Sequence, residues 1–314
     1  MEYYKLFGFV GILREVVKIF CKNGRLMACL TLLILSFYSI FFMSNYFFIK
    51  PLIADMVKLS MVLVTDPTSP QIGNLLIRMK EDIRAIVGGE WISALVSVVS
   101  SLFFATSTII ASAVIHGGKN LSVKELLLST IRSLKRPFHT WFYTALFGLG
   151  YNFFVLANLL STVLTVQHPV ASKALCIVLV VLASVLYAYL AVVWILAFVI
   201  SVLEEKSGIE ALGKAAELVK GMQLHGFLLN LLYTISGSVL VQGIRLIPLK
   251  QSSAFHVIIG LLVINSHRLV WMFCLMAFTV FYHQCKKTHE EEVELRVSFE
   301  YSKIPTTLLI ENIP

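Results

Sequence analysis

The sequence predicts an all-α integral membrane protein with six transmembrane helices, arranged as three units that each hold one interfacial helix and two spans. The first observation is composition: 58% of the 314 residues are apolar and only 14% are charged, which is outside the usual range of soluble domains. The second is that several apolar runs reach the roughly 20 residues that a helix needs to cross a bilayer. The third is a recurring short amphipathic pattern between these runs.

Six apolar runs have the length of a span. Each is expected to be a helix, because a lone span must satisfy its own backbone polar groups in lipid. The runs cover residues 26–49, 91–115, 141–164, 174–202, 227–249 and 256–285. Residues 1–285 are therefore predicted to form one membrane domain, followed by a cytosolic tail over 286–314. No cleavage pattern follows the first basic segment, which favours an uncleaved first span.

Lysines and arginines predict the orientation, because positive segments tend to stay in the cytosol. With the N-terminus inside, seventeen basic residues lie in inside segments and eight in outside segments. Both termini are therefore predicted to be cytosolic. The net charge of +8 follows from this asymmetry and favours anionic lipid over nucleic acid as the partner surface. The five cysteines are an odd number and imply no disulfide framework.

The amphipathic pattern predicts interfacial helices over residues 5–22, 122–136 and 207–220. Ser122 with Glu125, and Ser207 with Glu210, have the spacing of a capping box at a helix start. Gly24, Pro137 and Gly221 are the expected stops. The predicted apolar stripes are Leu127, Ile131 and Leu134 in the second helix and Ile209, Leu212, Ala216 and Val219 in the third. These helices are interpreted first as connecting helices that direct the chain into the bilayer, and second as surfaces that bind lipids or partner proteins.

The segment 50–90 is predicted to be the one large outside loop. It contains TDPTSP, a turn signal with two prolines, followed by IGNLLIRMKEDIRAIVGG, in which the apolar residues keep helical spacing. We expect a turn and then an amphipathic surface helix.

Four segments resemble a plant-specific family of six-span membrane proteins of unestablished function. They are LFGFVGILREVVKIF, GEW, SVLEEKSGIEALGKAAELVKG and FYHQCKKTHEE. The third segment is also distantly similar to a pattern in prokaryotic membrane domains, some of which are attached to glycerophosphodiester phosphodiesterases. No such catalytic domain is present in this sequence, so the resemblance implies a topology and no activity.

The main polar anomaly is the run Asn265, Ser266, His267 and Arg268 inside the sixth apolar run. An arginine at the bilayer centre costs at least ~2.5 kcal/mol, so it should face the bundle and pair there. The expected partners are Asn152, Tyr151, Asn230 and Gln242. The predicted binding residues are thus Arg268, His267, Asn265, Asn152 and Asn230, for an anion or a lipid headgroup. The alternative is a shallow segment over 256–264 and a span from Leu269, which would place Arg268 near an interface.

No motif for catalysis or a cofactor is found in the sequence, so the protein is predicted not to be an enzyme and to carry no cofactor. H-E-x-x-H, C-x-x-C, G-x-S-x-G and Gly-rich phosphate loops are missing. His283, Cys285 and His289 have the types of metal ligands, but no fourth ligand is evident and no metal site is predicted. Ser93, Ser97, Ser101 and Ala105 form a small-residue stripe for close helix packing, within the chain or in a homo-oligomer.

The functional hypothesis is a non-enzymatic protein that organises lipids or partner proteins at an endomembrane or plasma membrane. The alternative is a transporter of small solutes or lipids with its polar site around Arg268. A membrane enzyme is the least supported of the three readings, because no nucleophile with a base or metal is visible. Asn120, Leu121 and Ser122 form a glycosylation sequon that the predicted orientation keeps in the cytosol.

Overall fold

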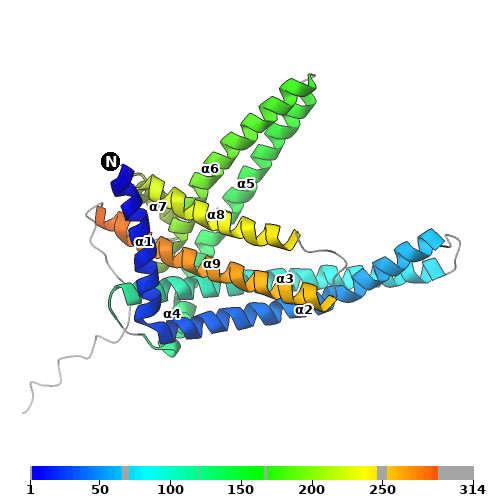
Figure 1. Ribbon diagram of the computed structural model, residues 1–314, viewed down its shortest axis with the longest axis horizontal. Coiled ribbons are helices and arrows are strands. Elements are labelled where there is room, and N and C mark those ends of the chain that lie inside the picture. The colour runs from blue at the N-terminus through cyan, green and yellow to red at the C-terminus, as the bar shows by residue number, and fades with distance from the viewer. Residues whose placement is uncertain (1, 66–70, 120, 166–167, 246–252, 289–314) are drawn as a thin grey trace, which may run out of the picture.

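The computed structural model describes residues 2–65, 71–119, 121–165, 168–245 and 253–288, and this part of the chain is helical without any strand. Its nine helices follow one order three times, a shorter helix and then two longer ones (Figure 1). The first set is α1 (Glu2–Lys22), α2 (Gly24–Thr65) and α3 (Gln71–His116). The second is α4 (Val123–Ser133), α5 (Lys135–Thr165) and α6 (Pro169–Leu203). The third is α7 (Ile209–Val219), α8 (Gln223–Arg245) and α9 (Ser253–Thr288).

Five helices in the described part are long and apolar enough to cross a membrane, where the sequence predicted six. They include Gly24–Lys50, Val87–His116, Lys135–Thr165, Val170–Leu203 and Ala254–Thr288. The predicted span over 227–249 is not among them. Its helix, α8, ends at Arg245, so the described part of this apolar run is shorter than the sequence predicted. Residues 246–249 lie outside the described residues.

The core lies at the end of the molecule where the short helices α1, α4 and α7 gather (Figure 1). There they pack against the last turns of α3, α6 and α9. The fully buried side chains of this end include Ile12 and Ile19 of α1, Ile115 of α3, Leu126 of α4, Ile200 of α6, Leu218 of α7 and Phe281 and Tyr282 of α9. We call this end the base. From the base, the hairpins α2–α3 and α5–α6 diverge in different directions (Figure 1).

The segment predicted as an outside loop is helical wherever it is described. Helix α2 continues through residue 65, and α3 begins at residue 71 and runs without interruption into the second span. The predicted surface helix is therefore the first part of α3 and not a separate element. Most of the proline turn, residues 66–70, lies outside the described residues.

The predicted helix starts are correct at α4 and wrong at α7. At α4, the backbone N–H of Ser122 donates to Oε2 of Glu125 at 3.0 Å, as a capping box requires. At α7 the N-cap is Gly208, at φ +59°, and Ser207 lies before it. The Gly208 N–H donates instead to the Thr140 hydroxyl of α5 at 2.9 Å. A contact between distant helices thus replaces the local cap.

Of the predicted stop residues, Gly221 directly follows the C-cap of α7, whereas Pro137 and Gly24 lie inside the helices that come next. Helix α7 ends at Val219 with Lys220 as its C-cap, and α4 ends at Ser133, before Pro137. Pro137 lies in the first turn of α5, where its missing N–H costs no helical hydrogen bond. The boundary between α1 and α2 falls at Asn23, and Gly24 is already the first residue of α2.

Candidate functional site

Arg268 lies in the middle of α9, which is a single helix from Ser253 to Thr288. Its guanidinium carbon is 3.7 Å from the centre of the Tyr38 ring of α2. Tyr38 is 3% exposed, so the cation stacks on a buried aromatic face, a favourable electrostatic contact. The expected pairing of Arg268 with polar residues of α5 and α8 is not what the structure shows, because its partner comes from α2.

Two neighbours of Arg268 in sequence also contact other helices. The Asn265 amide donates to the Ser39 hydroxyl of α2 at 3.0 Å, and the Ser39 hydroxyl lies 3.2 Å from the Asn265 amide oxygen. His267 Nε2 lies 3.5 Å from the Tyr233 hydroxyl of α8. The polar run in α9 therefore joins α9 to α2 and α8, and a structural role accounts for Asn265.

Asn152 and Asn230 belong to a different place, a groove of about 680 Å³ between α5, α6, α8 and α9. Each amide donates to a backbone carbonyl: Asn152 to Gly148 at 2.7 Å, and Asn230 to Ala188 at 3.4 Å. The structure thus separates the five predicted binding residues into two groups. Trp271 of α9 lines this groove and also the space beside Arg268.

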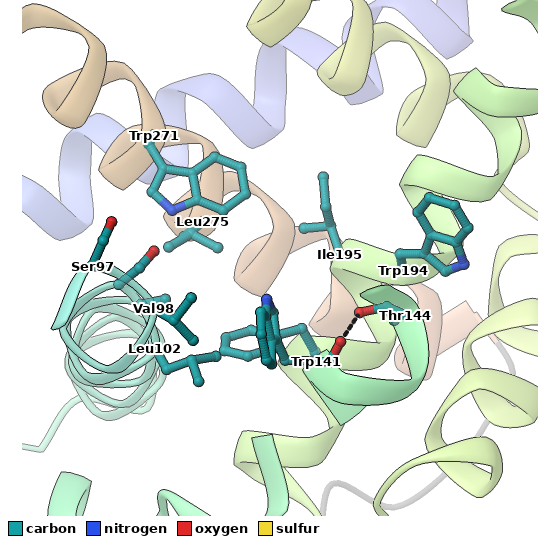
Figure 2. Close-up of a pocket in the computed structure, with 12 residues that line it drawn as sticks. Ser97, Val98, Leu102, Trp141, Thr144, Trp194, Ile195, Trp271 and Leu275 are labelled. Carbon is teal, nitrogen blue, oxygen red and sulfur yellow. Dashed lines mark hydrogen bonds between the residues drawn. The ribbon is translucent and has the colours of Figure 1, made fainter. Parts of the chain in front are cut away.

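A second cavity, of about 340 Å³, lies between α3, α5, α6 and α9. Trp271 and Leu275 lie on one side of it, Ser97, Val98 and Leu102 on another, and Ile195 and Trp194 on a third (Figure 2). Trp141 of α5 reaches the same space, so that three of the four tryptophans line it. We call this cavity the tryptophan pocket. Its volume is within the range of about 300–1,000 Å³ that is typical of ligand sites.

The small-residue stripe of α3 forms one wall of the tryptophan pocket. Ser97, Ser101 and Ala105 line it, while the Ser93 hydroxyl donates to the Asn45 side chain of α2 at 2.9 Å. The stripe was expected to bring helix backbones together. In the structure, the small side chains of the stripe leave a space between the helices, and this space is the pocket.

The sequence analysis missed a charged cluster at the base, centred on Glu204, the C-cap residue of α6. Its carboxylate lies 3.3 Å from Nζ of Lys214 on α7 and 3.5 Å from Nζ of Lys286 on α9. The Tyr282 hydroxyl donates to the same carboxylate, and Arg136 Nη1 donates to the Glu204 carbonyl at 3.2 Å. The cluster therefore connects α5, α6, α7 and α9.

Burial alone would raise the pKa of Glu204. The hydrogen bond from Tyr282 and the positive charges of Lys214 and Lys286 outweigh it and hold the pKa of this carboxyl below its ordinary value of 4.5. Glu204 is therefore a carboxylate at neutral pH and neutralises Lys286, which is only 4% exposed. Its sequence signal is a glutamate directly after a long apolar run.

Within the described ranges, no group of three His, Cys, Asp or Glu side chains is arranged so that it could hold a metal ion. The ring of His283 stacks on that of His116, with 5.0 Å between centroids, and His116 Nδ1 lies 3.8 Å from the Glu15 carboxylate. Cys285 Sγ lies 3.9 Å from the Met222 sulfur, and His289 is outside the described residues. All five cysteines are free thiols.

These features define a protein whose described part is helical, with several helices able to span a membrane, a base of short helices, and cavities among its long helices. The chain belongs to the family described as "Domain of unknown function (DUF8558)", which matches residues 1–300. No curated protein and no solved structure matches the chain. Membership in a family of unknown function agrees with the resemblance found in the sequence, whereas a plant origin stays a prediction.

Proposed function

We propose that this protein is a non-enzymatic multi-pass membrane protein that organises lipids, and through them partner proteins, at an endomembrane or plasma membrane. The observation that carries this proposal is the outer surface of the short helices. Each of α1, α4 and α7 packs one face into the base and exposes large apolar side chains elsewhere. In the proposed orientation the base and both termini are on the cytosolic side.

Helix α1 illustrates this division most clearly. Ile12 and Val16 are buried at 0% and 3% exposure, whereas Val10 and Val17 are 55% and 57% exposed. Lys18 is exposed beside Val17. An apolar strip beside basic residues is what binds a helix to the surface of an anionic bilayer.

Helices α4 and α7 repeat the arrangement. Ile131 of α4 and Ile209 of α7 are 62% and 60% exposed. The basic residues of these helices include Lys124 and Arg132 of α4 and Lys220, the C-cap of α7. Each basic residue near an anionic membrane surface contributes about 1 kcal/mol of attraction. Three such helices at one end of the molecule would enrich anionic lipid around the base.

The experiment measures lipid preference around the full-length protein in vesicles. Electron paramagnetic resonance with spin-labelled phosphatidylserine and phosphatidylcholine gives the relative affinity of each lipid for the protein surface. We expect a preference for phosphatidylserine that is lost in the variant Lys124→Gln/Arg132→Gln/Lys220→Gln. Arg84→Gln, an exposed change on the distal part of α3, is the control and should keep the preference. Equal affinities in the unchanged protein would refute the proposal.

The orientation has a separate test at the sequon Asn120, Leu121 and Ser122. A cytosolic base predicts that Asn120 carries no glycan after expression in a glycosylating cell. A shift in gel mobility that is reversed by endoglycosidase would place the base on the lumenal side. The lipid proposal would then apply to the opposite leaflet.

A transporter is the second candidate, and the groove that contains Asn152 and Asn230 favours it. Polar side chains that line a space among candidate spans are expected in transporters. Purified protein in vesicles with a fluorescent phospholipid would test this by the fraction of label that moves between leaflets. A rate equal to that of protein-free vesicles would exclude lipid transport.

A further inference from the structure

Arg268 lies on the same face of α9 as two residues that line the tryptophan pocket. Arg268, Trp271 and Leu275 are spaced by three and four residues on α9, so they lie on one face of the helix. A small space beside Arg268 and Tyr38 shares four lining residues with the pocket, namely Ser101, Ala105, Trp271 and Leu275. The cation therefore lies next to the pocket wall, with hydroxyl groups of Ser97 and Ser101 on the opposing helix.

Arg268 has no acidic partner among the described residues. Its guanidinium carbon lies 3.7 Å from the centre of the Tyr38 ring, and contact with one ring does not provide acceptors for the five N–H groups of a guanidinium. A guanidinium among apolar helices is costly unless an anion accepts these bonds. A carboxylate or a phosphate has the charge and the oxygen atoms that this position lacks.

Arg268 lies near the middle of the candidate spans around it. It is close to the centre of Ala254–Thr288, and its neighbours Tyr38 and Ser101 are close to the centres of Gly24–Lys50 and Val87–His116. The tryptophan pocket extends from it toward the base, because Trp271 and Leu275 lie between Arg268 and the basic end of α9. An acidic group at this depth is surrounded by helices and not by water, so the charge of Arg268 decides where it binds.

From these relationships we propose that Arg268 and the tryptophan pocket together bind a single-chain anionic lipid, with its acidic headgroup at Arg268 and its acyl chain in the pocket. The inference rests on the proposed function as a lipid-organising protein and assigns it one defined site. A single chain fits better than two because 340 Å³ is at the low end of ligand-site volumes. The apolar lining of Trp141, Ile195 and Leu275 suits an alkyl chain.

The test uses the full-length protein with Trp91→Phe, in detergent micelles. Trp91 is 76% exposed and lies outside the pocket, so its removal leaves only the three pocket tryptophans as fluorophores. The probe is 9,10-dibromostearate, whose bromine atoms quench indole fluorescence on contact. Its methyl ester has the same chain without the charge, and a brominated lysophosphatidate has a phosphate in place of the carboxylate.

We expect saturable quenching by the acid at concentrations at least about tenfold lower than by the methyl ester, as one charge-assisted interaction predicts. The change Arg268→Gln should remove this difference, Arg268→Lys should keep part of it, and the control Arg84→Gln should leave it intact. Ser101→Leu, which fills the pocket, should abolish saturable quenching by both probes. Tighter binding of the lysophosphatidate than of the fatty acid would identify phosphate as the preferred headgroup.

Equal quenching by acid and ester in the Trp91→Phe protein would overturn the inference. So would an Arg268→Gln variant that elutes as a single species, unfolds at the same temperature and still prefers the acid. The proposed function fails independently, since its test concerns basic residues of α4 and α7 at the base. If the unchanged protein shows no phosphatidylserine preference but binds the acid probe, only the role of the short helices is refuted. If it shows the preference but does not distinguish acid from ester, only the site is refuted.

Discussion

The ammonium group of Lys286 lies 3.5 Å from the carboxylate of Glu204, although 82 residues separate them in sequence. Lys286 is 4% exposed, and a charge at such a position is stable only when an opposite charge and hydrogen bonds accompany it. Glu204 supplies the charge and in addition holds Lys214 of α7. The pair therefore fixes the last turns of α6 and α9 to each other and to a short helix of the base.

We predict that Glu204→Gln lowers the stability of the base. Lys286 would lose its counter-charge while it stays buried, at a cost of about 1–3 kcal/mol. The measurement is the thermal unfolding midpoint of the purified protein in detergent at neutral pH. Glu217→Gln, an exposed change on α7, is the control and should leave the midpoint within error. Equal midpoints for all three proteins would contradict the structural role of the cluster.

The lowered pKa of Glu204 also predicts a pH dependence. The folded state keeps this carboxyl ionised at pH values where the unfolded chain, with a pKa near 4.5, already binds a proton. The stabilisation is therefore complete above about pH 4.5 and is lost as the pH falls through the folded pKa. The difference in unfolding midpoint between the unchanged protein and Glu204→Gln should shrink in that acidic range. A difference that grows on acidification would show that another group is responsible.

Gly208 is predicted to be intolerant of any side chain. Its φ of +59° and ψ of −127° are rarely adopted by other residues, and an added Cβ would lie 3.0 Å from two ring atoms of Tyr143. We expect Gly208→Ala to destabilise the protein by about 1–2 kcal/mol or more. Gly213, inside α7 and with open space around its Cα, is the matched position. There the alanine should stabilise the helix by about 0.5–1 kcal/mol.

The hydrogen bonds between Ser39 and Asn265 should couple α2 and α9. A double-mutant cycle with Ser39→Ala and Asn265→Ala isolates their interaction, which in membrane proteins averages about 0.6 kcal/mol. Unfolding of the four proteins in urea and mixed micelles gives the coupling energy. A coupling energy of zero would mean that the hydrogen bonds with Ser39 do not stabilise the protein. Asn265 would then be a candidate binding residue again.

The periodicity of the sequence predicted which segments are helical, but it did not predict which face of each short helix packs into the base. In α4 the predicted stripe included Ile131, which is 62% exposed, whereas Leu126 and Thr130 are at 1% and 0%. In a membrane protein the apolar stripe of a short helix can pack against the helix bundle or contact the lipid, and both surroundings are apolar. Periodicity alone does not distinguish them, and small or hydroxyl side chains can form the buried face.

The candidate site was only partly predictable for a related reason. Arg268 was singled out because a charge in an apolar run is conspicuous in a sequence. Its partner Tyr38 and the pocket beyond Trp271 come from helices far away in the chain, and no local pattern records such contacts. Glu204 was missed because a glutamate at a span end is ordinary, and only the fold brings Lys286 to it.

The first hairpin, α2–α3, is longer than the thickness of a membrane. The 42 residues of α2 correspond to about 63 Å of helix, and the hydrocarbon core accounts for about 30 Å of it. Because α3 runs alongside α2 as one helix of 46 residues, the part of the hairpin that exceeds the thickness of the hydrocarbon core is helical and not a loop. Beyond the candidate span Gly24–Lys50, residues 51–65 add about 22 Å of helix, so the tip of the hairpin is separated from the base by a distance that the rise of the α-helix fixes.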